Sequence, residues 1–158
     1  MGGPEAPSGV QRDRARRRSV LASIAAGGAL GTLARYLLAS VVHRSPGSFP
    51  WATFWTNVTG SFVLGLVLVL ILERFPPTRY LRAFIATGFC GAFTTFSTLA
   101  VETELLVRSG HAAVALTYAG VSLAAGLVAV WMGMVSGRLV PAAERLAPLL
   151  LRRRSRRR

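Results

Sequence analysis

The feature of this sequence that most limits its fold is a set of four long apolar segments. They cover Ser19–Val42, Ala52–Leu72, Leu81–Val107 and Ala112–Val135. A helix needs about 20 residues to cross the hydrocarbon core of a bilayer, and each segment reaches that length. Because backbone groups without hydrogen-bond partners are too costly in lipid, these segments are expected to be helices. The predicted fold class is therefore all-α, a polytopic membrane protein with four transmembrane helices.

An arginine-rich stretch precedes the first apolar segment, so a cleaved signal peptide is the alternative interpretation of that segment. The segment is too long for the apolar part of a signal peptide and contains Arg35 well inside it. We therefore interpret it as a membrane helix. The chain then divides into a basic tail over residues 1–18, a four-helix membrane domain over 19–137 and a second basic tail over 138–158. The first tail is rich in Gly, Pro, Ser and Arg and is expected to be disordered.

The net charge of +13 comes from 19 basic residues, all arginine, against six acids. Nucleic-acid binding is one explanation of such a charge. However, the arginines flank a membrane domain, where they attract anionic lipid head groups, so no nucleic-acid partner is expected. Sixteen of the arginines are predicted to lie on the side of the membrane that holds the termini. Arg44 and Arg108 are predicted on the other side, and Arg35 lies within the first helix. The positive-inside rule then places both termini in the cytoplasm, for a protein of the bacterial plasma membrane.

A strongly polar side chain stands out in each of the first two predicted helices. Arg35 lies one helical step after Gly31 on a face of small residues, where a cation either lines a water-filled vestibule or extends its charge to the membrane surface. Asn57 shares a face of the second helix with Gly60. Its amide either joins two helices by a hydrogen bond or donates to an anion.

The third apolar segment contains the stretch "GFCGAFTTFSTLAVETE" from Gly88 to Glu104. Two glycines followed by several hydroxyl residues make a poor continuous helix, and a break is tolerated at membrane depth only where it is buried in protein or lines a cavity. A break frees carbonyl oxygens, which are hard ligands for an ion such as Na⁺. Phe93 and Phe96 share a face and have positive ring edges that suit an anion, although ordinary packing also explains them.

These stretches resemble the Fluc (CrcB) family of bacterial fluoride channels. The resemblance covers about residues 27–133 and is carried by "GGALGTLARY", "TFWTNVTGSFVLG" and above all "GFCGAFTTFST…E". It implies two four-helix subunits packed antiparallel into a dimer with two pores and a structural Na⁺ at its centre, which is not transported. It also implies passive export of F⁻, which lowers cytoplasmic fluoride.

The resemblance assigns roles to individual residues. It puts Na⁺ on the backbone oxygens of Gly91 and Thr94. Separately, Gly91→Val is expected to damage the break sterically. It puts Asn57 and Phe96 on the fluoride path, whereas Leu99 stands where the family has a second phenylalanine. Tyr118 and Ser122 resemble hydroxyl-bearing path positions, with interhelical hydrogen bonding as the alternative. The other positions implied along or beside the path are Thr95, Ser97, Thr98 and Glu102.

Several other function classes are less consistent with the residues. No nucleophile–base pair, nucleotide-binding "GxxxxGK[ST]" motif or His/Cys/Asp metal-ligand set is present, so an enzyme is not expected. A small exporter of cationic drugs needs a carboxylate in its first helix, which carries Arg35 instead. A non-conducting subunit of a heterodimeric channel is the remaining alternative. An antiparallel dimer needs one subunit inserted upside down, whereas the arginine bias allows this chain only one orientation. We therefore expect a heterodimer with an inverted paralogue, with a homodimer as the alternative.

Overall fold

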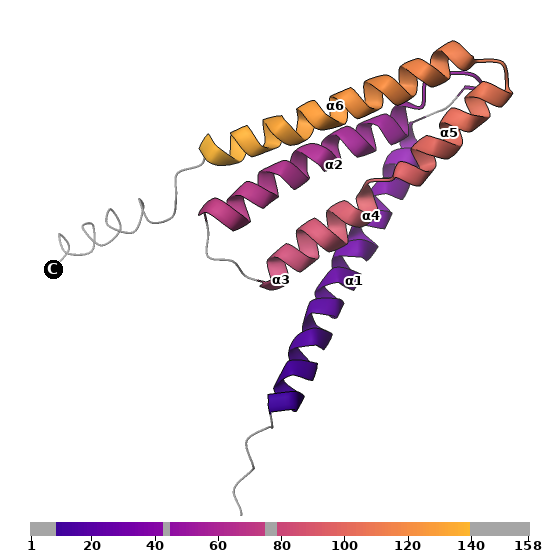
Figure 1. The fold of residues 1–158 in the computed structure, drawn as a ribbon. Helices are drawn as coiled ribbons and strands as arrows, with labels where there is room; N and C mark the ends of the chain where they lie inside the picture. Colours follow the sequence, from indigo (N-terminus) through magenta and orange to yellow (C-terminus); the bar gives the residue numbers. More distant parts are fainter. Residues whose placement is uncertain (1–8, 43–44, 75–78, 140–158) are drawn as a thin grey trace, which may run out of the picture.

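The computed structural model describes residues 9–42, 45–74 and 79–139. Apart from connecting turns and the residues between α4 and α5, this part of the chain is helical (Figure 1). Two segments, labelled η, are π-helical, with wider turns than an α-helix. The elements in chain order are α1 (Gly9–Val41), α2 (Trp51–Val69), η1 (Leu70–Arg74), α3 (Arg79–Arg82), η2 (Ala83–Cys90), α4 (Gly91–Phe93), α5 (Phe96–Arg108) and α6 (Ala112–Leu139).

Four helical stretches are long and apolar enough to cross a membrane, as the sequence predicts. They are Gly9–Val41, Trp51–Val69, Arg79–Arg108 and Ala112–Leu139. The first begins at Gly9, so the later part of the expected disordered tail is helical. Arginine and alanine are good helix formers, and extending a helix that the apolar segment has already nucleated costs little. Residues 1–8 and 140–158 of the two expected tails lie outside the described residues.

Glycines allow close packing at two helix crossings. In one, α1 lies against η2, and a Cβ on Gly27 or Gly31 would clash with the carbonyl oxygen of Phe84 or Phe89. In the other, α2 and α6 run side by side (Figure 1), and a Cβ on Gly133 would clash with the Phe62 carbonyl. Small residues let membrane helices approach closely enough for extensive van der Waals contact. These crossings therefore fix the two helix pairs on which the rest of the fold is built.

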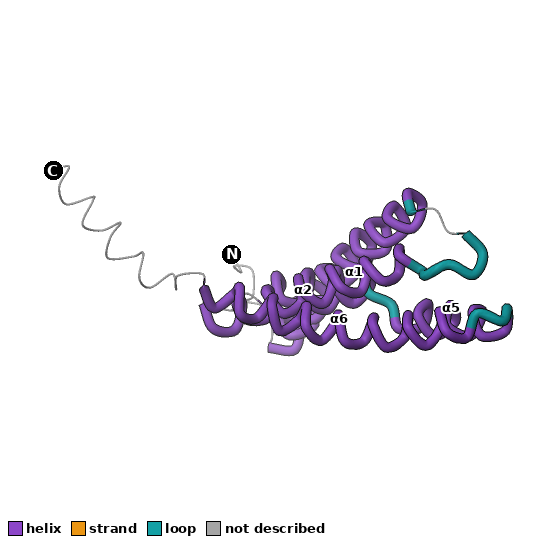
Figure 2. Tube along the Cα trace, turned by 90° about the horizontal axis from the view of Figure 1, so that it is seen from above, coloured by secondary structure: helices purple, strands orange, loops and turns teal. Residues whose placement is uncertain are grey.

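The third membrane helix changes its neighbour at the break. Before the break, η2 and α4 pack against α1, and after it α5 packs against α6. Figure 2 shows the residues of the break in teal, leading into α5. The third helix thus joins the two glycine-packed pairs, which brings residues of α1, α2 and α5 close together at the break.

A compact apolar core lies between α2, α5 and α6. Its buried residues include Tyr118 and Ala115, which have no exposed surface, together with Phe54, Leu99 and Leu106. At the other end of the bundle, Arg138 of α6 donates a hydrogen bond to Glu73 of η1 over 3.4 Å. The C-terminal end of α6 therefore lies beside the end of the second membrane helix, at the end of the bundle opposite the α5–α6 turn.

Candidate functional site

Thr94 and Thr95 form the break in the third helix. Both have extended backbones, with φ/ψ of −75°/155° at Thr94 and −151°/116° at Thr95. The Thr94 amide and hydroxyl both donate to the carbonyl of Cys90, at 3.0 and 2.9 Å, which ends the helix before the break. The Thr95 hydroxyl accepts from the Thr98 amide at 3.1 Å and so caps the N-terminus of α5. The predicted break is thus a structured feature with its own hydrogen bonds.

The break diverts two backbone donors from their usual helical acceptors. In a continuous helix the Thr95 amide would donate to the Gly91 carbonyl, and the Thr98 amide to the Thr94 carbonyl. Instead the Thr95 amide donates to Asn57 Oδ1 at 2.8 Å, and the Thr98 amide to Thr95 Oγ1. The carbonyl oxygens of Gly91 and Thr94 therefore lose their helical donors, which leaves them able to accept from another group or bind a cation.

Asn57 holds the break from the neighbouring helix. Besides accepting from the Thr95 amide, its Nδ2 donates to the Thr95 carbonyl at 3.0 Å. Gly60, one turn further along α2, makes room for the break, because a Cβ there would clash with the methyl group of Thr94. Asn57 is therefore an interhelical hydrogen-bonding residue, and one N–H of its amide group remains for a further acceptor.

A cavity of about 310 Å³ opens beside the break. It lies toward the end of the bundle that holds the C-terminal end of α1 and the start of α2. Among the residues that the structure describes, its lining is rich in hydroxyl groups and includes one cation but no carboxylate. The lining residues are Thr32, Arg35, Tyr36, Ala39, Ala52, Thr53, Thr56, Thr95 and Thr98.

The cavity contains hydrogen-bond donors that suit an anion. The half-buried Arg35 makes no ion pair within the described residues, so its guanidinium N–H groups remain for solvent or an anion. Thr98 accepts from the Thr95 hydroxyl at 3.0 Å, which leaves the Thr98 hydroxyl proton to donate elsewhere. Thr56, in contrast, donates to the Ala52 carbonyl at 2.8 Å. Arg35 and Thr98 are thus the better donors among these three.

Thr53 and Thr56 also line the cavity, although neither was predicted from the sequence. Thr53 is buried and precedes Asn57 by four residues, which puts both on one face of α2. This four-residue spacing from Asn57 could have indicated that Thr53 faces the same cavity. The predicted positions Thr95 and Thr98 do line this cavity, and the exposed Ser97 has its hydroxyl 3.2 Å from that of Thr95.

Glu102 of α5 and Tyr118 of α6 form a second polar group, between the break and the turn that joins the two helices. The Tyr118 hydroxyl donates to Glu102 Oε2 at 2.7 Å, so a carboxylate within the third membrane helix has a strong partner. Ser122, one helical turn after Tyr118, is also buried, and its hydroxyl has no hydrogen-bond partner among the described residues. Such an oxygen is costly to bury unless another molecule or subunit supplies a partner.

The structure separates Phe96 from Leu99. Phe96 is 73% exposed at the start of α5, whereas Leu99 is 7% exposed in the apolar core. Within this chain Phe96 therefore packs against little, and any path that it lines requires a second subunit or lipid beside it.

The described residues contain no group of three or more His, Cys, Asp or Glu side chains that could hold a metal ion. Backbone carbonyls are the other source of hard ligands, and Gly91 and Thr94 supply two that have lost their helical donors. Gly91 is exposed, and a Cβ built on it would meet no atom within 4 Å. Two carbonyl oxygens do not complete the coordination of a hard cation, so a site here would need ligands from beyond these two residues.

The fold and site define a small four-helix membrane protein with a broken third helix and a hydroxyl-lined, cationic cavity beside the break. Residues 22–134 match the family described as "CrcB-like protein, Camphor Resistance (CrcB)". The chain belongs to this family, which confirms the family resemblance inferred from its sequence.

Relatives of known name are similar over most of the chain. The "Fluoride-specific ion channel FluC 3" of Streptomyces avermitilis is 50% identical over 123 residues, which are 78% of this chain and 60% of that protein. The "Fluoride-specific ion channel FluC 1" of Mycolicibacterium paratuberculosis is 46% identical over 110 residues, covering 70% and 83% of the two chains. The protein of the same name in Mycobacterium bovis is 44% identical over 120 residues, covering 76% and 91%. These relatives are named as ion channels and not as enzymes.

Proposed function

We propose that this chain is a subunit of a fluoride-selective channel that passively exports F⁻ across the plasma membrane. The observation that carries the proposal is the double hydrogen bond by which Asn57 holds the Thr95 backbone open inside a membrane helix. Such a break is costly in lipid, and an ion path is the usual reason to keep one. The printed names of the relatives supply the ion, fluoride.

The cavity provides a physical means of admitting a small anion. Fluoride is strongly hydrated, so it enters a narrow path only where protein donors replace its water. The Arg35 guanidinium supplies charge, and the hydroxyl of Thr98 supplies a donor at the break. Beyond the cavity, the remaining Asn57 N–H, the Phe96 ring edge and the Ser122 hydroxyl are the proposed sequence of contacts. Tyr118, whose hydroxyl donates to Glu102, would line this path without donating to the ion.

The assembly that suits these surfaces is an antiparallel dimer with two pores and a structural Na⁺ at its centre. The Gly91 and Thr94 carbonyls of each subunit would contribute ligands to that ion, which is not transported. The exposed Phe96 and the open surface at Gly91 would then face the second subunit. We propose an inverted paralogue as this subunit, with both termini of the present chain in the cytoplasm, since 16 of its 19 arginines share one side.

Efflux from liposomes tests the proposed function. Purified protein should release fluoride through a membrane made permeable to K⁺, as measured with a fluoride electrode, and release chloride far more slowly. Replacing Na⁺ by a large organic cation throughout purification should abolish the flux. Flux that is indifferent to Na⁺ would remove the proposed metal site.

Two controls separate the alternative functions. Extrusion of a cationic dye with no fluoride release would favour a drug exporter, although the described part of the cavity lining has an arginine and no carboxylate. Fluoride release only after co-expression with a second subunit would favour the heterodimer. Full rescue of the growth of a fluoride-sensitive bacterium by this chain alone would contradict the heterodimer but would still support the proposed channel function.

A further inference from the structure

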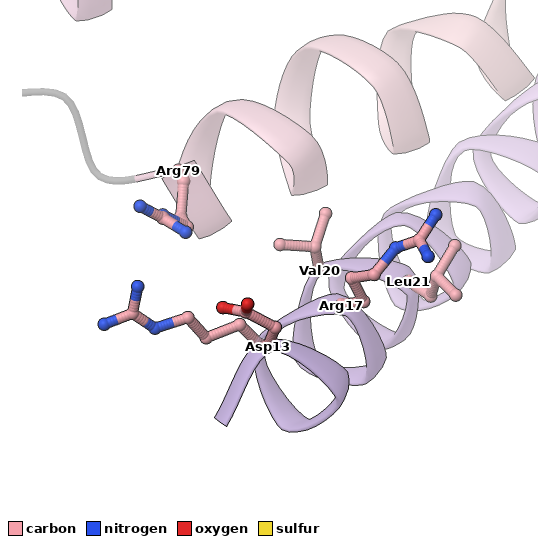
Figure 3. Close-up of a pocket in the computed structure, with 6 residues that line it drawn as sticks. Asp13, Arg17, Val20, Leu21 and Arg79 are labelled. Carbon is pink, nitrogen blue, oxygen red and sulfur yellow. The ribbon is translucent and has the colours of Figure 1, made fainter. Parts of the chain in front are cut away.

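A second cavity, of about 640 Å³, lies at the opposite end of α1 from the first. Of the described residues that line it, five come from α1 and one, Arg79, lies at the start of the third membrane helix. Figure 3 shows Arg79 facing α1 across the gap, with Asp13 and Val20 on the opposite side. The α1 lining residues are Asp13, Arg16, Arg17, Val20 and Leu21.

These α1 residues follow the helical spacing i, i+3, i+4, i+7 and i+8, so they form one face. The same face continues to Gly27 and Gly31, which pack against η2. Toward Gly9, α1 runs away from the other helices (Figure 1), so the face is no longer covered. The cavity is the wedge that opens where the two helices separate.

The chemistry of the wedge changes along its length. Arg16 and Arg17 are exposed and lie before Ser19, the start of the apolar segment, whereas Val20 and Leu21 lie just within it. Leu21 is 63% exposed although it begins a membrane span. The cavity therefore places cations at the level of the lipid head groups and apolar side chains at the level of the first acyl carbons.

Within the part of the chain that the structure describes, the charges of the wedge are not neutralised. The three arginines face one acid, and no ion pair joins Asp13 to any of them within the described residues. Guanidinium groups bind phosphate with two hydrogen bonds at a time, and near a membrane surface each adds to the attraction for anionic lipid. We propose that this wedge is a specific site for one anionic phospholipid, its phosphate among Arg16, Arg17 and Arg79 and its acyl chain along Val20 and Leu21.

A lipid suits the site better than a free phosphate because two of the five α1 residues in the lining, Val20 and Leu21, are apolar. Asp13 adds an acceptor that suits a head group with hydroxyls, such as the glycerol of phosphatidylglycerol. By joining α1 to the third helix, the bound lipid would hold together two elements that diverge at this end. The proposal does not depend on which ion the protein conducts.

The test measures lipid binding by two sets of matched variants. The pair Arg16→Gln and Arg17→Gln removes two charges from the wedge, whereas Arg14→Gln and Arg18→Gln removes two charges from the same stretch of α1 but outside the lining. Likewise, Arg79→Gln is matched by Arg82→Gln. Full-length protein is mixed with phosphatidylglycerol, and the retained lipid is counted by native mass spectrometry.

The wedge pair should weaken phosphatidylglycerol retention by roughly thirtyfold, while the control pair should weaken it much less. Asp13→Asn, which removes no arginine, should increase retention of phosphatidic acid, which lacks head-group hydroxyls. Equal losses in the two pairs, or no change in Asp13→Asn, would indicate diffuse attraction to the surface and overturn the site. The melting temperature is also compared in phosphatidylglycerol vesicles and in phosphatidylcholine vesicles with added inorganic phosphate. An equal rise in the two would overturn the assignment of the site to a lipid.

Discussion

Asn57 and Thr95 lie 38 positions apart in the sequence, yet the side-chain amide of one pairs with both backbone groups of the other. Nδ2 donates to the Thr95 carbonyl at 3.0 Å, and Oδ1 accepts from the Thr95 amide at 2.8 Å. A single side chain thus satisfies the Thr95 amide, which the break would otherwise leave unpaired in lipid, and adds a bond to the carbonyl with which Thr95 begins α5. Asn57 is therefore needed for the geometry of the break, whatever it contributes to ion contact.

Asn57→Asp should disrupt this pairing. The carboxylate still accepts from the Thr95 amide, but it cannot donate to the carbonyl, and it brings a negative charge toward that oxygen. The free energy of unfolding should fall by about 1–3 kcal/mol, and fluoride flux should fall at least about tenfold. Thr59→Ala is the control, since its hydroxyl bonds within its own helix. Equal flux in the two variants would show that the pairing is dispensable.

Gly88→Ala and Gly91→Ala should fail in different ways. A Cβ on Gly88 would lie 2.6 Å from the Ile24 carbonyl oxygen, so this variant should lower the stability of the chain itself by about 1–3 kcal/mol. A Cβ on Gly91 meets nothing within 4 Å, and its φ of −63° suits any residue. The steric damage expected at Gly91 from sequence therefore does not arise within one chain.

Gly91→Ala should instead reduce the dimer fraction, measured by cross-linking, and the dependence of flux on Na⁺. Its helix content should remain that of the unmodified protein. An unchanged dimer fraction in this variant would place the subunit interface elsewhere.

Phe96→Ile should leave the fold intact and reduce flux. The side chain is 73% exposed, so little packing is lost, while the polarised ring edge is removed. We expect an unchanged melting temperature and a severalfold lower efflux from liposomes. Leu105→Ile, an exposed aliphatic exchange on the same helix, should change neither quantity. Unaltered efflux in Phe96→Ile would leave Phe96 only a packing role.

Leu99→Phe should destabilise the protein, although it introduces the residue expected at this position from the family resemblance. Leu99 is buried in the core with Phe54 and Tyr118, and extra volume in a packed core costs about 1–3 kcal/mol. A lower melting temperature in detergent is expected, and Leu99→Met, which conserves volume, is the control. A higher melting temperature in Leu99→Phe would show that the core around Leu99 can hold the larger side chain.

The sequence by itself determined the four membrane helices and the existence of the break. Segment length and local composition decide both, because lipid demands helical hydrogen bonding wherever a chain crosses it, and the glycine and threonine residues around position 94 oppose a continuous helix. The family, too, was evident from these stretches.

Only the tertiary structure decided which polar residues meet. It pairs Asn57 with Thr95, gathers Arg35 and Thr98 at one cavity, and buries Leu99 while leaving Phe96 exposed. Apolar periodicity, which marks the core of a soluble helix, carries little information here, because lipid is as apolar as the protein interior. Contacts between membrane helices depend instead on close packing, which the four-residue spacing of Gly27 and Gly31 does indicate, and on hydrogen bonds between distant segments, which local spacing does not encode.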